Sequence, residues 1–295
     1  MNPVAETCIR IERLGKTYRG QATPALQEID LAVAEGEFVA LVGASGCGKS
    51  TLLRLIAGLE APSLGRVCLD GRPVMGPGAD RAVVFQDYSL YPWLNVLENV
   101  RFCRSLRAHT RDASESEVNA AVERAYALLE LMGLDEVRER YPNQLSGGMR
   151  QRVAIARALM AQPRVLLMDE PFGALDAQTR EVMHELILRL FEIERSTIVF
   201  VTHDVEEAVY LADRVVVLAP QPGRIDSIHP VALPPPGARH PDLKLAPEFL
   251  SQKKTVLDRI RATSGVQRDL DKLSRLAELS RRGRRPDAKP AIGNY

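Results

Sequence analysis

The chain has 295 residues, 45% of them hydrophobic and 26% charged, which is the composition of an ordinary soluble globular protein. Its formal net charge of +1 excludes the strongly basic balance that attracts nucleic acid or acidic lipid, so we expect no nucleic-acid partner. The four cysteines are far apart and form no CxxC pair, which is typical of reduced cytosolic thiols and not of a disulfide framework or a zinc site.

The chain shows neither of the patterns that direct a protein into or across a membrane. Its first residues, MNPVAETCIRIERLG, lack the basic start and apolar stretch of a secretory signal. No apolar run approaches the roughly 20 residues that cross a bilayer. If the protein acts at a membrane, we expect a partner to hold it there.

The N-terminal part alternates strands and a helix. Cys8–Leu14 alternates apolar and charged residues, as a half-buried strand does, and Ile29–Val33 is a second strand candidate. Phe38–Val42 is continuously apolar, which favours a strand buried on both faces. A helix is predicted over Ser50–Ala57, with Gly58 as its end.

The middle of the chain changes from strands to helices and back again. Short strands are predicted at Val67–Leu69 and Ala82–Phe85. From about residue 88 to 161 the apolar spacing becomes helical, notably at Val118, Val122, Ala125, Leu128, Leu129 and Met132, with a stop at Gly133. Strands and helices then alternate again over Val165–Met168, Thr179–Phe191, Ile198–Thr202, Val205–Leu211 and Val215–Leu218. This order predicts an α/β core that contains a helical insert.

After about Pro220 the alternation stops. Residues 234–237, PPPG, predict a linker or turn, and helices are predicted over Glu248–Thr263 and Asp269–Arg282. The arginine-rich stretch that follows is typical of a disordered end. It could contact anionic lipid, although charge runs are more often simply solvated.

A complete phosphate-binding motif joins the third strand to the first helix. Residues 43–50 read GASGCGKS, in which glycines let backbone N–H groups approach phosphates and the helix N-terminus adds a positive dipole end. We therefore expect a nucleotide triphosphate to contact Gly43, Ala44, Ser45, Gly46, Cys47, Gly48, Lys49, Ser50 and Thr51. Lys49 would reach the β- and γ-phosphates, and Ser50 the Mg²⁺ ion. The alternative is a glycine-rich turn with a chance Lys-Ser.

Two adjacent carboxylates follow the apolar run Val165–Met168. Asp169 stands where a Mg-nucleotide needs an acidic group near its metal. Glu170 could polarise the attacking water as a general base. Such pairs at strand ends are more often solvated turns, but the phosphate loop favours the functional interpretation.

A second motif, LSGGMRQR at residues 145–152, lies about a hundred residues after the phosphate loop and leads into a predicted helix over Met149–Ala161. Small residues at a helix N-terminus expose N–H groups that suit a γ-phosphate, although Ser146 could also be a simple N-cap. With these motifs in this order, the chain resembles the ATP-binding subunit of ABC transporters over roughly residues 8–230.

The resemblance implies a fold and a division of the chain. The fold class is α/β, a P-loop NTPase core with a mixed sheet flanked by helices, an inserted helical subdomain over about residues 88–161 and an N-terminal antiparallel β part. The ATPase domain would span residues 1–230. Residues 231–295 would form a partly helical extension without a separate regulatory barrel.

The resemblance also implies that two subunits sandwich two ATP molecules head to tail, so a homodimer is expected. The phosphate loop, Asp169 and Glu170 of one copy would then face Ser146, Gly147 and Gly148 of the other. This arrangement makes ATP hydrolysis the expected activity, with ATP and Mg²⁺ as the bound species.

Further site residues follow from the resemblance alone, since each has an ordinary structural alternative. Gln86 matches the glutamine that contacts Mg²⁺ or the water, so Mg²⁺ would be held by Ser50, Gln86 and Asp169. Asp176 matches the loop that links the two ATP sites, and His203 the switch histidine near the γ-phosphate. Tyr18 matches the aromatic residue that stacks on adenine.

The stretch Phe85–Val100 resembles that of nitrate, sulfonate and taurine importers, with Tyr91 in place of their second leucine; Leu218–Ile225 is similar to them as well. The resemblance implies transmembrane permease subunits as partners, a periplasmic solute-binding protein as an indirect one, and a peripheral position on the cytoplasmic face of the bacterial inner membrane. Trp93, the only tryptophan, would face the membrane subunit or pack a helical core, or do both.

Other functions fit the residues less well. A soluble ABC ATPase of DNA repair or translation needs no membrane partner, but such chains usually carry two such domains or long coiled coils. A phosphate-loop kinase or GTPase would not explain LSGGMRQR, and a non-enzymatic scaffold would not need Lys49, Glu170 and His203 together.

Overall fold

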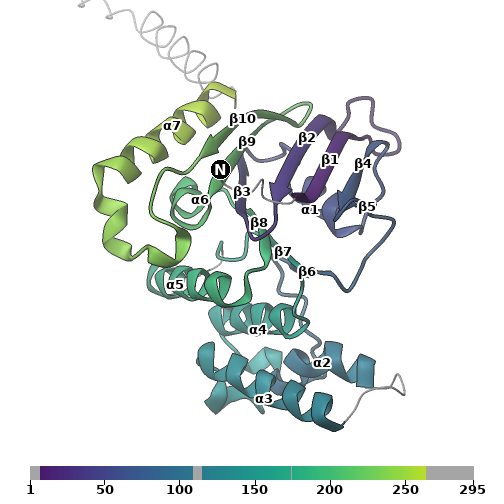
Figure 1. Ribbon diagram of the computed structural model, residues 1–295, viewed down its shortest axis with the longest axis vertical. Helices are drawn as coiled ribbons and strands as arrows, with labels where there is room; N and C mark the ends of the chain where they lie inside the picture. The colour runs from purple at the N-terminus through teal and green to yellow at the C-terminus, as the bar shows by residue number, and fades with distance from the viewer. Residues whose placement is uncertain (1–6, 109–114, 174, 264–295) are drawn as a thin grey trace, which may run out of the picture.

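The computed structural model describes residues 7–108, 115–173 and 175–263. Its largest sheet has six strands in the order β10-β9-β3-β8-β7-β6 (Figure 1). All neighbours in this sheet are parallel except β10, which pairs antiparallel with β9 at one edge. The strands are β3 (Phe38–Gly43), β6 (Arg81–Val84), β7 (Val165–Asp169), β8 (Thr197–Val201), β9 (Arg214–Ala219) and β10 (Arg224–Pro230).

A second sheet of four antiparallel strands, in the order β2-β1-β4-β5, lies beside the first (Figure 1). Its strands are β1 (Thr7–Lys16), β2 (Leu26–Ala34), β4 (Leu64–Leu69) and β5 (Arg72–Pro73). Helix α1 (Lys49–Ala57) packs in the same apolar core as both sheets, which explains why Leu52, Leu53, Leu55 and Ile56 are all buried. A helix enclosed between two sheets is apolar on most of its circumference.

Strand β3 separates two hydrophobic cores. Because side chains alternate across a strand, Val39 and Leu41 face the core that holds α1, whereas Phe38, Ala40 and Val42 face the core formed with the other helices. The continuous apolar run in the sequence is therefore explained by burial on both faces, as predicted. The predicted helix over Ser50–Ala57 is confirmed, and Gly58 ends it in a left-handed conformation.

Three helices lie together at one end of the molecule: α2 (Val96–Ala108), α3 (Glu115–Leu131) and α4 (Gly147–Met160) (Figure 1). Two short 3-10 turns, η1 (Asp135–Val137) and η2 (Pro142–Gln144), connect α3 to α4. The predicted apolar stripe of α3 is buried at Ala125, Leu128, Leu129 and Met132, but Val118 at its start is exposed.

The segment after β9 packs over α6 (Val205–Leu211). Helix α5 (Ala177–Glu194) lies beside both α6 and this segment. The segment after β9 contains β10, the turns η3 (Pro236–Ala238) and η4 (Pro241–Leu245), and α7 (Pro247–Thr263). Arg239, only 5% exposed, donates hydrogen bonds to the carbonyls of Tyr210 and Ala212 at the end of α6, and burial lowers the pKa of Arg239 to about 10.

The sequence patterns predict no strand after Pro220, whereas the structure has β10 there. Its side chains are mostly half-exposed at the sheet edge, so the sequence carries no clear alternation there. The predicted helix over Glu248–Thr263 is confirmed as α7, whereas the one over Asp269–Arg282 lies outside the described residues. None of the helices in the described ranges is long and apolar enough to cross a membrane.

Candidate active site

The phosphate loop leaves the carboxyl end of β3 and enters α1. Gly43, Gly46 and Gly48 all adopt positive φ values, of 152°, 77° and 93°. A Cβ atom on Gly43 would lie 2.4 Å from the carbonyl oxygen of Leu218, so a larger residue cannot take this position. Gly48 precedes α1 without a side-chain cap, which leaves the first N–H groups of the helix available to a ligand.

A cavity of about 440 Å³ lies over this loop. It is lined by Ala25, Ser45, Gly46, Gly48, Lys49, Ser50, Thr51, Glu170 and His203. The fold thus brings the phosphate loop together with two residues that lie more than a hundred positions later in the chain. Ala25, which comes from the connection between β1 and β2, was not predicted, since an alanine before a strand carries no signal of a site.

The Lys49 ammonium lies inside the loop. Its Nζ donates to the carbonyl oxygens of Gly43 at 2.9 Å and Ala44 at 3.3 Å, and the residue is only 7% exposed. The ammonium has three N–H donors, and it can redirect one of them from a loop carbonyl to a phosphate oxygen.

Ser50 and Asp169 meet where α1 and β7 converge. Ser50 Oγ donates a 2.9 Å hydrogen bond to Asp169 Oδ1, and Asp169 is 8% exposed. Burial raises the pKa of Asp169, while the hydrogen bond from Ser50 opposes that shift. A buried carboxylate without a cationic partner in contact is one that a divalent cation would neutralise.

The donor set fits Mg²⁺ bound together with phosphates. The described residues contain no cluster of three or more His, Cys, Asp or Glu side chains that could hold a metal by themselves. Mg²⁺ in nucleotide sites typically takes one or two protein oxygens, phosphate oxygens and water. Ser50 Oγ and Asp169 Oδ1 are hard oxygen ligands of this kind.

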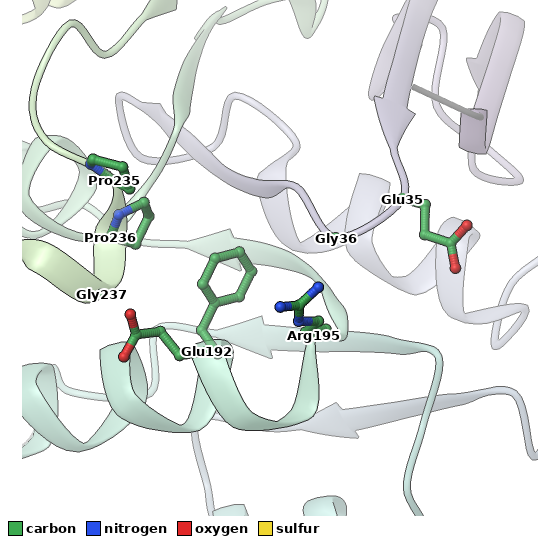
Figure 2. A pocket seen from close by; sticks show the side chains of 8 residues that line it. Glu35, Gly36, Glu192, Arg195, Pro235, Pro236 and Gly237 are labelled. Carbon is green, nitrogen blue, oxygen red and sulfur yellow. The ribbon is translucent and has the colours of Figure 1, made fainter. Parts of the chain in front are cut away.

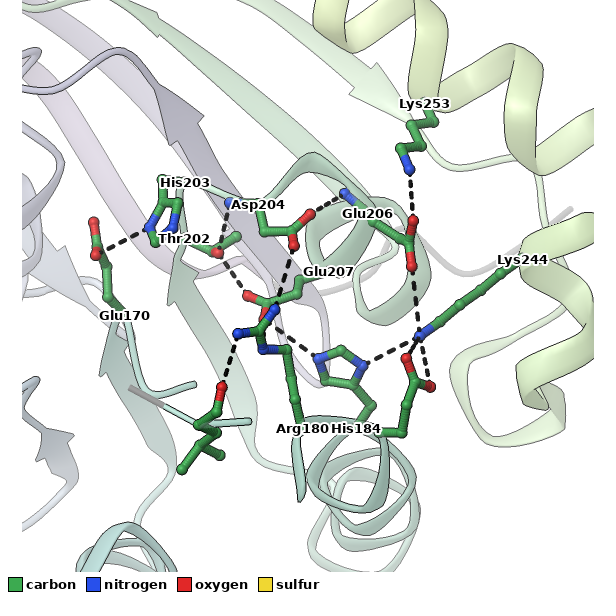
Figure 3. Close-up of polar contacts among 12 residues, drawn as sticks. Glu170, Arg180, His184, Thr202, His203, Asp204, Glu206, Glu207, Lys244 and Lys253 are labelled. Carbon is green, nitrogen blue, oxygen red and sulfur yellow. Dashed lines mark hydrogen bonds and ion pairs between the residues drawn. The ribbon is translucent and has the colours of Figure 1, made fainter. Parts of the chain in front are cut away.

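Glu170 and His203 face each other at the edge of the same cavity (Figure 3). His203 Nδ1 lies 3.1 Å from Glu170 Oε2. Strands β7 and β8 are parallel and pair Asp169 with Val201, so the residues that follow both strands emerge at one edge of the sheet. Glu170 has a φ of 46°, and its N–H donates to Val201 O at 2.9 Å, which fixes where its side chain begins.

Tyr18 and Gln86 lie outside the lining of the cavity. The Tyr18 hydroxyl is 3.3 Å from Thr51 Oγ1 and donates to Glu60 Oε1 at 3.2 Å, so the ring stands beside the phosphate loop. Gln86 follows the edge strand β6 and is exposed. The structure therefore places Tyr18 next to the site and does not bring Gln86 to it.

A second group of predicted residues lies away from the cavity, where α4 and α5 begin. Ser146 Oγ accepts a hydrogen bond from the N–H of Met149 at 3.2 Å, which confirms that Ser146 is the N-cap of α4. A Cβ on Gly148 would lie 3.1 Å from Thr179 Cγ2, so the two helix starts are in contact. Neither Ser146, Gly147 nor Gly148 lines the cavity.

Asp176 belongs to this second group as the N-cap of α5. Its carboxylate accepts hydrogen bonds from the N–H of Thr179 at 2.9 Å and from Thr179 Oγ1 at 2.7 Å. These hydrogen bonds lower the pKa of Asp176, so it stays ionised at neutral pH. Within one chain, the predicted site residues thus form two separate groups.

Sequence reasoning missed a buried polar cluster behind His203 that contains Thr202, Glu207 and Arg180 (Figure 3). Glu207 lies in the first turn of α6, where acidic residues are common because they complement the helix dipole. Nothing in the sequence therefore distinguished it from a solvated helix start.

Comparison with known proteins gives matches along most of the chain. The family model described as ABC transporter matches residues 26–173. The nitrate import ATP-binding protein of a Synechocystis species is 46% identical over 259 residues, which cover 86% of this chain and 95% of the relative. The taurine import ATP-binding protein of Pseudomonas putida is 51% identical over 217 residues, covering 74% of this chain and 80% of the relative.

A solved structure also matches. It is the dimeric post-hydrolysis state of an ATP-binding cassette bound to ADP and Pi. The TM-score is 0.67 at 34% identity, and the match covers 76% of this chain and 99% of the other. The fold is therefore that of an ATP-binding cassette.

Proposed function

The chain belongs to the ATP-binding subunits of ABC transporters, and from this premise we propose that it hydrolyses Mg-ATP in a head-to-tail dimer to drive import of a small anion. The membership makes it an ATP hydrolase. One observation supports the proposed site above the others: the phosphate loop, the Ser50–Asp169 pair and the Glu170–His203 pair surround the same edge of the sheet.

Nucleotide binding is assigned to the loop and its surroundings. The backbone N–H groups of residues 43–51 and the ammonium of Lys49 would hold the phosphates. Ser50 and Asp169 would hold Mg²⁺, which when bound neutralises charge on the phosphates. Tyr18 would stack on adenine, since its ring stands beside Thr51. Gln86 would join the metal site only after the segment that follows β6 moves toward the cavity.

Hydrolysis is assigned to Glu170 and His203. The Glu170 carboxylate would take a proton from the attacking water, because it lines the cavity and is 24% exposed. The imidazole of His203, 3.1 Å away, would orient Glu170 and donate to the γ-phosphate. These roles require only small movements of side chains that already face the same space.

The separation of the two residue groups supports the shared site. The start of α4, with Ser146 and two glycines, presents N–H groups suited to a phosphate but does not line the cavity of its own chain. A second copy in head-to-tail orientation would bring this helix start to the γ-phosphate. Asp176, which lies beside that helix start, would then connect the two sites. The dimeric form of the matched cassette is consistent with this arrangement.

A mixture of two inactive variants should recover activity. Ser146→Arg blocks the helix start that is donated to the partner, and Glu170→Gln removes the proposed base. In an equal mixture about half of the dimers are mixed, and each has one of its two sites intact, so about a quarter of wild-type ATPase activity is expected. Steady-state phosphate release from the separate and mixed variants measures this.

The matched control mixes Glu170→Gln with a chain that carries both substitutions, which leaves no intact site in any dimer. Activity in the mixture that does not exceed this control would contradict the shared site.

The partner face is proposed around Trp93. Trp93 is 67% exposed, so the alternative that it packs in the core of the helical end is wrong. Its ring stands on Tyr91, with centroids 5.6 Å apart, and Tyr91 contacts Phe102 at 4.4 Å. A supported, exposed indole is typical of an interface anchor, and the permease is the proposed partner. The proposed location is then the cytoplasmic face of the inner membrane.

Uptake of a small anion should depend on the face around Trp93. The names of the matched relatives point to nitrate or taurine, and alkanesulfonates share the sulfonate group of taurine. Cells that carry Trp93→Ala should lose most ATP-dependent uptake of the labelled anion, while the purified variant keeps its own ATPase activity within about twofold. Leu64→Ala is the control, because Leu64 is also an exposed apolar residue, at 72%, but lies on the four-stranded sheet. Normal uptake by Trp93→Ala would place the permease contact elsewhere.

A further inference from the structure

His203 has little packing of its own to hold it. Its side chain is 65% exposed, and Glu170 is its polar contact in the described structure. The position of an exposed imidazole is then set by the backbone on either side of it. These neighbours, Thr202 and Asp204, are both tied to one buried hydroxyl.

That hydroxyl is Thr202 Oγ1, which lies behind His203 (Figure 3). It donates to Glu207 Oε2 at 2.6 Å and accepts a hydrogen bond from the N–H of Asp204 at 3.0 Å. Thr202 is 2% and Glu207 4% exposed. The Thr202 hydroxyl therefore fixes the residues on both sides of His203: its bond to Glu207 holds Thr202 itself, and its bond from the N–H holds Asp204. Because Thr202 and Glu207 are buried, water does not compete for the short hydrogen bond between them.

Two polar side chains from α5 lie close to the buried carboxylate of Glu207. Arg180 Nε lies 3.6 Å and His184 Nε2 3.5 Å from Glu207 Oε1. Lys244 Nζ lies 3.4 Å from the other ring nitrogen of His184, Nδ1. The Glu207 carboxylate thus has three polar neighbours, of which Thr202 is hydrogen-bonded to it.

Arg180 extends the cluster to the second group of site residues. Its NH2 donates to the carbonyl oxygen of Leu175 at 2.9 Å, and Leu175 directly precedes Asp176. The same guanidinium therefore contacts the carboxylate behind His203 and the backbone beside Asp176.

We infer that Glu207 is a positioning residue that sets His203 through Thr202 and, through Arg180, links His203 to the loop that carries Asp176. The inference rests on the proposed role of His203 in hydrolysis. Glu207 does not line the nucleotide cavity, so it acts on turnover and not on nucleotide binding.

The test is a double-mutant cycle with His203, measured on the full-length chain. Glu207→Ala should lower kcat for Mg-ATP by about tenfold or more, the usual effect of removing a partner that orients a histidine. The affinity for Mg-ATP, measured by equilibrium binding, should stay within twofold. In a His203→Ala background, Glu207→Ala should lower kcat no further, because its effect passes through the imidazole.

A pair of substitutions at Thr202 keeps the test valid if Glu207→Ala folds poorly. Thr202→Val keeps the shape but removes the hydroxyl, and should reproduce the loss in kcat. Thr202→Ser keeps the hydroxyl and should retain turnover. Glu206→Ala is the matched control, since Glu206 is the adjacent carboxylate but pairs with Lys253 and Lys244 and not with Thr202.

Two results would overturn the inference in different ways. An equal loss from Glu207→Ala with and without His203 would show that Glu207 acts independently of the histidine, while the proposed function stands. Wild-type kcat in the single variant His203→Ala would overturn both the proposed role of His203 and the positioning role that depends on it.

Discussion

Glu170→Gln is expected to bind Mg-ATP with wild-type affinity and to lower kcat by about 10²- to 10⁴-fold, the usual contribution of a general base. The amide has nearly the same size as the carboxylate, so the backbone hydrogen bond to Val201 and the positive φ at this residue are unaffected. An amide cannot accept the proton of the attacking water. ATP then stays intact in the shared site, and the dimer that it bridges should persist.

Single-turnover phosphate release and light scattering with and without Mg-ATP measure the two parts of this prediction. Glu123→Gln, at an exposed position on α3, is the control for loss of one carboxylate. Turnover within threefold of wild type would exclude Glu170 as the base. Loss of ATP affinity would mean that Glu170 acts in binding, and a monomer with bound ATP would contradict the head-to-tail dimer.

Lys49→Ala is expected to weaken the binding of ATP itself. Hydrogen bonds that involve a charged group contribute about 1.5–3 kcal/mol, which corresponds to a rise in Kd of about 10- to 150-fold. The substitution also removes the donor that holds the Gly43 and Ala44 carbonyls, so the loop loses part of the order that it has before binding. Equilibrium binding of a fluorescent ATP analogue measures the change.

Lys254→Ala removes a lysine charge from an exposed position on α7 and should leave the Kd unchanged. The thermal midpoint of Lys49→Ala should also be recorded, since a large fall would indicate a folding defect. An unchanged Kd in a folded Lys49→Ala variant would contradict the assignment of the phosphate loop.

The polar cluster behind His203 could not be found from the sequence, because its members come from separate parts of the chain. Thr202 and Glu207 are close in the chain, but Arg180 and His184 come from α5, which the sequence does not place against α6. A threonine after a strand and a glutamate in a first helical turn are both common. Their joint burial at 2% and 4% exposure is what distinguishes them.

The edge strand β10 and the exposure of Trp93 likewise could not be predicted from the sequence. β10 is paired along one edge only and its side chains are exposed or partly exposed, so its apolar residues show no clear alternation. An aromatic residue among apolar neighbours can face inward or outward with the same spacing; here Trp93 faces outward and its ring contacts Tyr91, which in turn contacts Phe102.

The sequence by itself determined the strand–loop–helix phosphate motif, the carboxylates after β7 and the family, because each depends on residues that are contiguous in the chain. Only the tertiary structure decided which distant residues meet. The parallel register of β7 and β8 brings Glu170 to His203, and the approach of α1 to β7 brings Ser50 to Asp169. It also decided that Ser146, at the start of α4, does not line its own chain's cavity. Local periodicity reports burial and not pairing, so these contacts follow only from long-range packing.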